Sequence, residues 1–210
     1  MYTPALFTEN RREVLHEIVR QHPLATLLSI HDGDIECTHL PMFLDPSGKS
    51  LRAHMARANE HWKILDQRQA SAIFHGPEHY ISPSWYPSKQ EHGRVVPTWN
   101  YVVVHVRGRV TVHDDADFLL SNVTELTDHN ERRLGTKWQV ADAPQEFIQN
   151  QTQAIVGIEL AIEKIEGKFK LSQNRAPQDR EAVIRQLEAL GTDTSKAMSR
   201  IMREMMKAPI

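Results

Sequence analysis

The chain has 210 residues, of which 40% are hydrophobic and 25% are charged, proportions that are ordinary for globular proteins. A chain of this length buries roughly 70% of its unfolded surface, so it needs neither a disulfide nor a metal to fold. No stretch approaches the roughly 18 consecutive apolar residues of a membrane-spanning helix, and the first residues do not resemble a secretory signal. The single cysteine, Cys37, excludes an internal disulfide and a multi-cysteine zinc site. We therefore expect a cytoplasmic protein.

Charge is unevenly distributed along the chain. The formal net charge is −2, whereas domains that bind nucleic acid over their whole surface are usually far more basic. From Lys168 to Ile210 there are nine Lys and Arg against five Asp and Glu, which gives +4 and leaves −6 for residues 1–167. A solvated pair of helices explains this basic end, and a phosphate-facing surface is the alternative.

In the first half of the chain, short elements follow one another at hairpin spacing. A capping box at Asn10 and Glu13 begins a helix that Pro23 stops. Alternating and turn-forming residues then predict a mixture of strands and one further helix. The expected elements are a helix over Asn10–Gln21, strands over Leu24–Ile30, Ile35–Leu44 and Leu51–Ala56, a helix from Asn59 to about Arg68, and a strand over Ser71–Phe74.

The clearest strand of the chain is Tyr101–His113. His105, Arg107 and Arg109 share one parity, which predicts one face on a core and the other on solvent or a site. The opposite parity holds Val102, Val104, Val106, Val110 and Val112. Asp114 and Asp115 are suited to cap a helix that follows, a strand alternates through 158–162, and two helices (177–190 and about 194–207) close the chain. This pattern predicts a mainly β, α+β fold: an antiparallel barrel over residues 1–172, with flanking helices, and a C-terminal helical pair over 173–210.

Histidine and tryptophan concentrate in residues 39–105, which hold seven of the twelve His and three of the four Trp. Proline interrupts two stretches of this window, 80–87 and 96–101. Such a mixture suits a concave site that grips a flat polar ligand by stacking and hydrogen bonds. An aromatic-rich subunit interface is the alternative.

Several familiar motifs do not occur in this sequence. There is no G-x-S-x-G elbow, no G-x-G-x-x-G and no P-loop. His75 and His79 have a metal-like spacing, but Gly76 and Pro77 between them argue against zinc. One phosphate-site candidate remains in the segment 54–63, where Arg57 offers a bidentate guanidinium at the expected start of a helix.

Six distinctive blocks are spread over almost the full length of this sequence. They are Met1-Tyr2-x-Pro4-x-x-Phe7, Thr38–Pro41, His54-x-Ala56-Arg57-Ala58-Asn59-x-x-Trp62, Phe74-x-Gly76-Pro77-x-x-Tyr80–Tyr86, Val96–Tyr101-x-x-Val104-His105 and Lys170–Arg175. Together these blocks resemble the PaiB family of FMN-binding negative transcriptional regulators. One residue departs from the family pattern: Glu60 stands where proline is expected after Ala58-Asn59.

The resemblance implies a flavin-reductase-like split barrel that binds FMN at the junction of a homodimer. By analogy, backbone groups of Thr38, His39, Leu40 and Pro41 would line the flavin ring, and His54, Arg57, Asn59, Trp62 and Lys63 would hold the phosphate end. Ser82, Ser84, Trp85, Trp99 and Asn100 would complete the pocket, and Ser172, Gln173, Asn174 and Arg175 would approach from the partner chain.

For function, the resemblance implies negative transcriptional regulation. The last two helices could form a helix-turn-helix motif, which would make DNA a candidate partner. Arg200, Arg203 and Lys207 would then lie on one side of the second helix. The methionines at helical spacing favour packing instead. The rival function is an FMN-dependent oxidoreductase of the flavin-reductase type, acting on a small molecule, although the sequence identifies no catalytic residue. A flavin-binding sensor without turnover is a third class.

Overall fold

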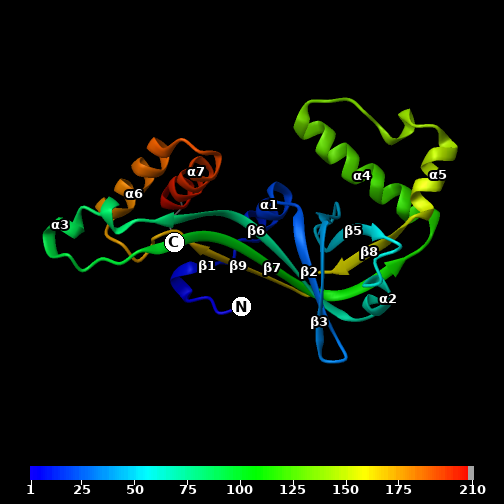
Figure 1. Cartoon of the computed structure of the whole chain (residues 1–210), viewed down its shortest axis with the longest axis horizontal. Coiled ribbons are helices and arrows are strands. Elements are labelled where there is room, and N and C mark those ends of the chain that lie inside the picture. The colour runs from blue at the N-terminus through cyan, green and yellow to red at the C-terminus, as the bar shows by residue number, and fades with distance from the viewer. Residues whose placement is uncertain (208–210) are drawn as a thin grey trace. The chain divides into compact units, whose positions relative to one another are not determined.

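A computed structural model describes residues 1–207 of the chain (Figure 1). In this range the expected α+β class with a largely antiparallel sheet is confirmed. The strands are β1 (Thr8–Glu9), β2 (Leu24–His31), β3 (Asp34–Pro41), β4 (Phe43–Leu44), β5 (Ser50–Ala56), β6 (Gln69–Ile81), β7 (Thr98–His113), β8 (Ile155–Ala161) and β9 (Lys164–Lys170). The α-helices are α1 (Arg12–Gln21), α2 (Trp62–Leu65), α3 (Ser88–His92), α4 (Ala116–Leu134), α5 (Gln145–Gln153), α6 (Pro177–Leu190) and α7 (Asp193–Lys207).

The chain divides into two compact units. The barrel unit comprises Arg12–Phe74 and His105–Ile165, and the helical unit comprises Met1–Arg11, His75–Val104 and the chain from Glu166 onward. This division differs from the predicted boundary after residue 172, because β6 and β7 each begin in one unit and end in the other.

In the barrel unit, alternation along the strands builds the core. Strands pair in the order β3-β2-β6-β7-β8-β5-β4. Leu27, Leu51, Val106 and Ile158 are completely buried, and burying each such side chain contributes about 1.5–3 kcal/mol. The β2–β3 hairpin turns at Asp32 and Gly33, whose φ angles of 51° and 91° fit the two-residue turn expected from the sequence.

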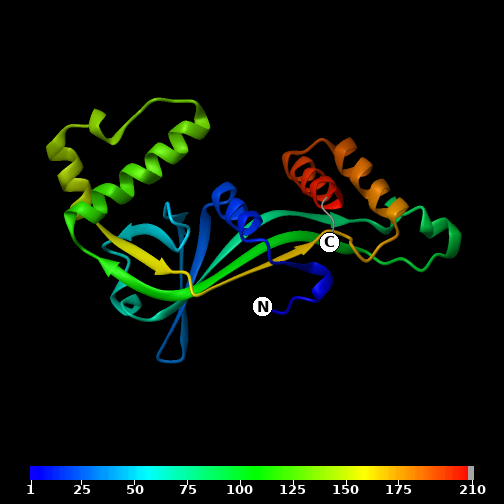
Figure 2. The same ribbon diagram turned by 180° about the vertical axis from the view of Figure 1, so that it is seen from behind.

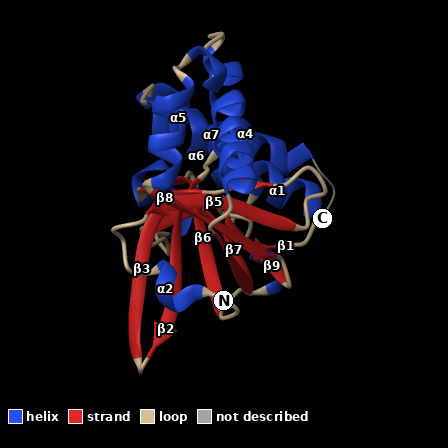
Figure 3. Ribbon diagram, turned by 90° about the vertical axis from the view of Figure 1, so that its right-hand side faces the viewer, coloured by secondary structure: helices blue, strands red, loops and turns tan. Residues whose placement is uncertain are grey.

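The longest helix, α4, covers one side of β5 and β8 together with α5 (Figure 3). It begins as predicted, since the Asp115 carboxylate accepts a hydrogen bond from the backbone N–H of Phe118 at 2.8 Å. Between this helix and the strands, Glu159 accepts from Ser50 Oγ at 2.7 Å and from Arg52 Nε at 3.4 Å. The polar side chains Ser50 and Arg52 of β5 thus have their hydrogen-bond partner inside the barrel unit.

In the helical unit, α6 and α7 pack side by side (Figure 2). Pro177 begins α6 and Gly191, with a φ of 69°, ends it, as the sequence predicts. Met198 and Met202 of α7 are buried, which favours the packing interpretation of the methionines. On the same helix, Arg203 is paired with Glu188 at 2.7 Å and with Glu181 at 3.4 Å.

Three predicted elements were wrong in extent. The strand expected over Ile35–Leu44 is interrupted at Met42 and forms β3 and β4. The helix expected over Asn59–Arg68 is the single turn Trp62–Leu65, because two turns of chain precede it. The strand expected over Ser71–Phe74 is the 13-residue β6, which continues through Gly76 and Pro77. Any residue with a Cβ at position 76 would clash with β7, since that atom would lie 2.9 Å from Val102 Cβ. Glycine avoids this clash and lets β6 continue beside β7. Within residues 1–207, no helix is both long enough and apolar enough to cross a membrane.

Candidate functional site

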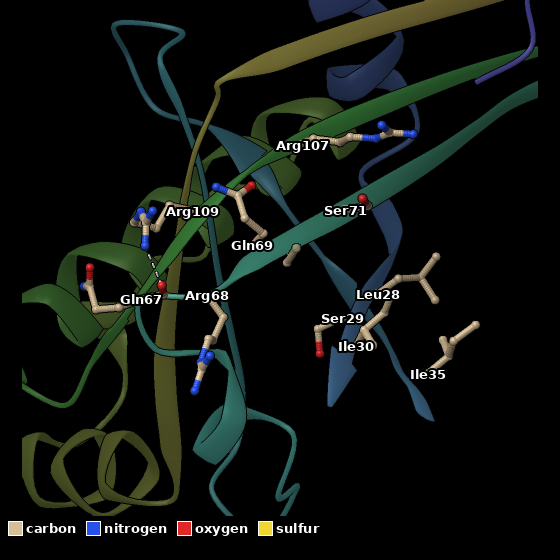
Figure 4. Close-up of a pocket in the computed structure, with 11 residues that line it drawn as sticks. Leu28, Ser29, Ile30, Ile35, Gln67, Arg68, Gln69, Ser71, Arg107 and Arg109 are labelled. Atoms are coloured by element: carbon tan, nitrogen blue, oxygen red, sulfur yellow. Dashed lines mark hydrogen bonds between the residues drawn. The ribbon is translucent and has the colours of Figure 1, made fainter. Parts of the chain in front are cut away.

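One large concavity of the barrel unit is lined mainly by residues of β2, β6 and β7 and of the segment before β6 (Figure 4). Its volume is about 710 Å³, within the range of roughly 300–1,000 Å³ that is usual for ligand sites. We call it the arginine pocket. Its lining consists of Arg68, Arg107, Arg109, Leu28, Ile30, Ile35, Ser29, Gln67, Gln69, Ala70 and Ser71.

Strand parity explains why arginines and apolar residues meet in the arginine pocket. On β7 the even positions from 102 to 110 are buried, so Arg107 and Arg109 emerge on the opposite face. Leu28 and Ile30 have the same relation to the buried positions of β2. The arginine pocket therefore combines an apolar wall with a cationic wall.

The cationic wall has no acidic counterpart. Among the residues that the structure describes, no Asp or Glu lines the arginine pocket. Arg109 Nη1 donates to the backbone carbonyl of Gln67 at 2.7 Å (Figure 4). Neither Arg68 nor Arg107 forms an ion pair in residues 1–207. Unpaired guanidinium groups on one concave surface attract an anion, above all a phosphate.

A buried hydrogen-bond network connects two of the predicted residues to this pocket. His61 Nδ1 lies 2.8 Å from Thr38 Oγ1, and His61 Nε2 lies 2.9 Å from Ser29 Oγ. Asn59 Nδ2 donates to the same Thr38 oxygen at 3.1 Å. Since Ser29 also lines the arginine pocket, Thr38 and Asn59 are connected to the pocket wall through His61 and Ser29.

Burial lowers the pKa of His61 from its usual 6.5, and the nearby Glu36 opposes this effect. The folded protein therefore holds the His61 proton less tightly than the unfolded chain does. As far as His61 is concerned, we expect the free energy of unfolding to be constant well above pH 6.5 and to fall as the pH drops through that value.

His16 and His22 also have pKa values lowered by burial, so they add to the same loss of stability. Urea unfolding at pH 7.5, 6.5 and 5.5 measures the combined slope. His61→Gln removes one titrating group while keeping hydrogen-bonding capacity, so we expect a smaller slope in this variant. An unchanged slope would show that His61 takes up its proton equally in both states.

The predicted phosphate segment is organised differently from the expectation. Arg57 Nε donates to the carbonyl of Gln153 at 2.8 Å, Nη2 donates to the carbonyl of Ile155 at 2.9 Å, and both terminal nitrogens contact the Asp114 carboxylate. Lys63 is paired with Glu60. Because α2 is a single turn, the segment has no long helix whose N-terminus could bind a phosphate. These contacts commit Arg57 to the ends of α5 and β8.

The other predicted residues of the barrel unit are dispersed. His39 Nδ1 lies 3.1 Å from Thr26 Oγ1, Leu40 is buried, and Pro41 is exposed. Trp62 Nε1 donates to the Arg57 carbonyl at 2.9 Å. His54 lies against α4, with Nδ1 2.9 Å from Asn122 Oδ1. In residues 1–207 no hydrogen bond joins His54 to Thr38 or Asn59.

Nine of the predicted residues lie in the helical unit. Three of them, Asn100, Ser172 and Arg175, make contacts with residues distant in the sequence. Asn100 Nδ2 donates to Ser172 Oγ at 3.0 Å in the buried interior of the unit, and the Arg175 guanidinium lies 4.9 Å from the Tyr86 ring centre. The remaining residues hold local structure or ring pairs, and their part in ligand binding stays a prediction. Ser82 caps the turn at Ser84, Trp85 and Trp99 contact His79 and Tyr80, Gln173 bonds its own neighbouring backbone, and Asn174 is exposed.

Residue-by-residue reasoning missed the three arginines and Ser29. The available signal was the parity of Tyr101–His113, which places Arg107 and Arg109 on a face open to a site. Arg68 and Ser29 carry no comparable signal, because only the pairing of β2 with β6 brings their segments together.

Comparison with known proteins shows which family the chain resembles. The family model described as "Putative FMN-binding domain" matches residues 1–164. Among curated proteins, Uncharacterized protein AN0679 of Emericella nidulans is 32% identical over 97% of both chains. Protease synthase and sporulation protein PAI 2 of Bacillus subtilis is 28% identical over the full length of both.

Solved structures share the fold at low sequence identity. The FAD and heme binding protein from Mycobacterium smegmatis has a TM-score of 0.58 at 18% identity, covering 83% of this chain and 79% of that one. The flavocytochrome Anf3 from Azotobacter vinelandii has a TM-score of 0.58 at 14% identity, covering 84% and 75%. The fold likeness confirms the expected split-barrel architecture. The chain therefore belongs to the FMN-binding family of PaiB-type proteins, and FMN is the cofactor of this family.

Proposed function

We propose that this PaiB-type protein binds FMN in the arginine pocket and acts as a flavin-dependent negative transcriptional regulator. One observation supports this binding site. Among the described residues, three arginines and no carboxylate line the arginine pocket, whose volume is about 710 Å³. FMN combines a phosphate that carries up to two negative charges with a flat, largely apolar ring. The cationic and apolar walls fit these two parts.

In this proposal, Arg107 and Arg109 bind the phosphate, and Leu28, Ile30 and Ile35 provide the surface against which the ring is desolvated. Ser71 and Gln69 supply neutral polar contacts on the same face. Bound FMN supplies hydride or electron transfer. The network of Ser29, His61, Thr38 and Asn59 holds the end of the pocket in position.

The test is to incubate the purified protein with FMN, remove free ligand and record the visible absorption spectrum. Riboflavin serves as the control, because it has the ring without the phosphate. We expect retention of FMN and at least about 100-fold weaker binding of riboflavin, since two or more charge-assisted hydrogen bonds are lost. Equal binding of the two ligands would contradict a phosphate site lined by arginines.

We also propose that the chain forms a homodimer through the β2–β3 hairpin. β3 ends the strand order of the barrel unit, and Ile30 and Ile35 near its turn are 76% and 71% exposed. An exposed edge strand with apolar side chains is a typical association surface. These features are what support the proposal.

The expected result of sedimentation velocity is a dimer for the unaltered protein and a monomer for the double variant Ile30→Glu, Ile35→Glu. Leu134→Glu is the matched control, since Leu134 is 74% exposed but lies at the end of α4. A monomeric unaltered protein, or a double variant that stays dimeric, would place the interface elsewhere or remove it.

The regulatory part of the proposal rests on the PaiB-type relationship. Direct DNA binding through α7 has reduced support, because Arg203 is paired with Glu188 and Glu181 and only Arg200 and Lys207 remain exposed on the proposed side. Fluorescence anisotropy of a 30-base-pair duplex tests it. Binding that weakens steeply with salt would support a DNA-binding regulator, and no binding at low salt would contradict it.

The second candidate is an FMN-dependent oxidoreductase of the flavin-reductase type. The exposure of Arg107 and Arg109 at the arginine pocket favours it, because a small reductant or acceptor can reach this side of the pocket. Oxidation of NADH or NADPH by the FMN-loaded protein, above the rate with free FMN, would support this function. A rate equal to that of free FMN would contradict it.

A further inference from the structure

A second pocket of the barrel unit differs in chemistry from the arginine pocket. It lies between β8, α4, α5 and the 3-10 turn at Val140–Asp142, and its volume is about 270 Å³. Val123, Ile148 and Ile155 form its apolar part, with Trp138 and Phe147 beside them. No charged side chain of the described residues lines it. We call it the aromatic pocket.

His54 supplies a defined polar group in the aromatic pocket. Its Nδ1 lies 2.9 Å from Oδ1 of Asn122, which is 1% exposed. The Asn122 amide thereby engages Nδ1, and Nε2 is the ring nitrogen left for a further hydrogen bond. Within residues 1–207, Nε2 makes no hydrogen bond. A residue that lines the pocket thus has one ring nitrogen available for a hydrogen bond to a polar group of a ligand.

We infer that the aromatic pocket binds a small, uncharged, planar aromatic molecule with one hydrogen-bonding group, of about the size of indole. An apolar cavity of about 150 Å³ already holds benzene, so 270 Å³ has room for two fused rings and not for FMN. A charged ligand would lose its hydration without finding a counter-ion.

The aromatic walls support the same ligand class. Trp138 is 49% exposed and Phe147 is 55% exposed, although both lie at a concave surface where apolar rings are usually covered. A planar aromatic ligand would cover them by stacked or edge-to-face contacts. Neither the FMN site nor the regulatory role of the chain requires this ligand.

The experiment uses 5-fluoroindole as the probe and follows its ¹⁹F NMR line width with the full-length protein, both free of FMN and saturated with it. We expect broadening that unlabelled indole reverses, to the same extent in both samples. 5-Fluoroindole-2-carboxylate reports on charge, and we expect it to bind at least about 10-fold more weakly in the FMN-saturated sample, since desolvation of its carboxylate is not compensated.

Two variants locate the site. Phe147→Ala removes a half-exposed ring and should weaken binding about 10-fold or more, and Ala143→Trp should fill the pocket and abolish binding. Leu134→Ala is the matched control, because Leu134 is exposed and does not line the pocket; it should leave binding unchanged. The inference is overturned if 5-fluoroindole does not broaden, if Phe147→Ala binds it as the unaltered protein does, or if the carboxylate binds equally well. The results with 5-fluoroindole and its variants in the FMN-free sample are independent of whether FMN binds in the arginine pocket.

Discussion

Replacing Arg107 and Arg109 together by glutamine is expected to weaken FMN binding at least about 100-fold. Each guanidinium contact with a phosphate is a charge-assisted hydrogen bond worth roughly 1.5–3 kcal/mol, and two of them correspond to two or more powers of ten in affinity. Both side chains are exposed, and loss of the hydrogen bond from Arg109 to the Gln67 carbonyl should lower the free energy of unfolding by only about 1 kcal/mol. Titration of the protein with FMN, followed by the quenching of flavin fluorescence, measures the effect.

Arg57→Gln is the matched control for this double variant. Arg57 is the arginine that the sequence singles out, yet its nitrogens contact Asp114 and the carbonyls of Gln153 and Ile155. We therefore expect Arg57→Gln to lower the unfolding temperature and to leave FMN affinity within about threefold. The opposite pattern, with FMN lost in Arg57→Gln and retained in the double variant, would move the phosphate back to segment 54–63.

Gly108→Ala is expected to cost roughly 3 kcal/mol or more of the free energy of unfolding. A Cβ at this position would lie 1.6 Å from the carbonyl oxygen of Ala161 and 2.8 Å from its carbonyl carbon. The clash is with backbone at the end of β8, which no change of side-chain rotamer can relieve, so the strands must separate. At about 2–4 °C per kcal/mol, the unfolding temperature should fall by roughly 6 °C or more.

Gly135→Ala separates this clash from the ordinary effect of replacing a glycine. Gly135 ends α4 with a φ of 71°, and nothing lies within 4 Å of a Cβ there. It should cost only about 1–2 kcal/mol, for the left-handed backbone. Thermal and urea unfolding of both variants compare the two costs. A Gly108→Ala protein as stable as Gly135→Ala would show that β7 and β8 can shift apart easily at this point.

The local elements were determined by short-range sequence patterns. The Asp32-Gly33 turn, the valine parity of β7, the Asp115 cap of α4 and the Pro177 and Gly191 limits of α6 each depend on residues within a few positions of one another. Backbone preferences and side-chain alternation act over that range, so these features can be predicted without the fold. The family blocks added the cofactor, because they span almost the whole chain.

Only the tertiary structure decided which of these residues have partners within the protein and which line a pocket. Arg57 is committed to Asp114, which is 57 positions away in the sequence, and no local pattern reveals such a partner. The arginine pocket exists because β2, β6 and β7 lie beside one another, which brings Ser29, Arg68 and Arg107 to one surface. Local sequence therefore determined which side chains point away from the core, and strand pairing between distant segments decided which of them share a pocket.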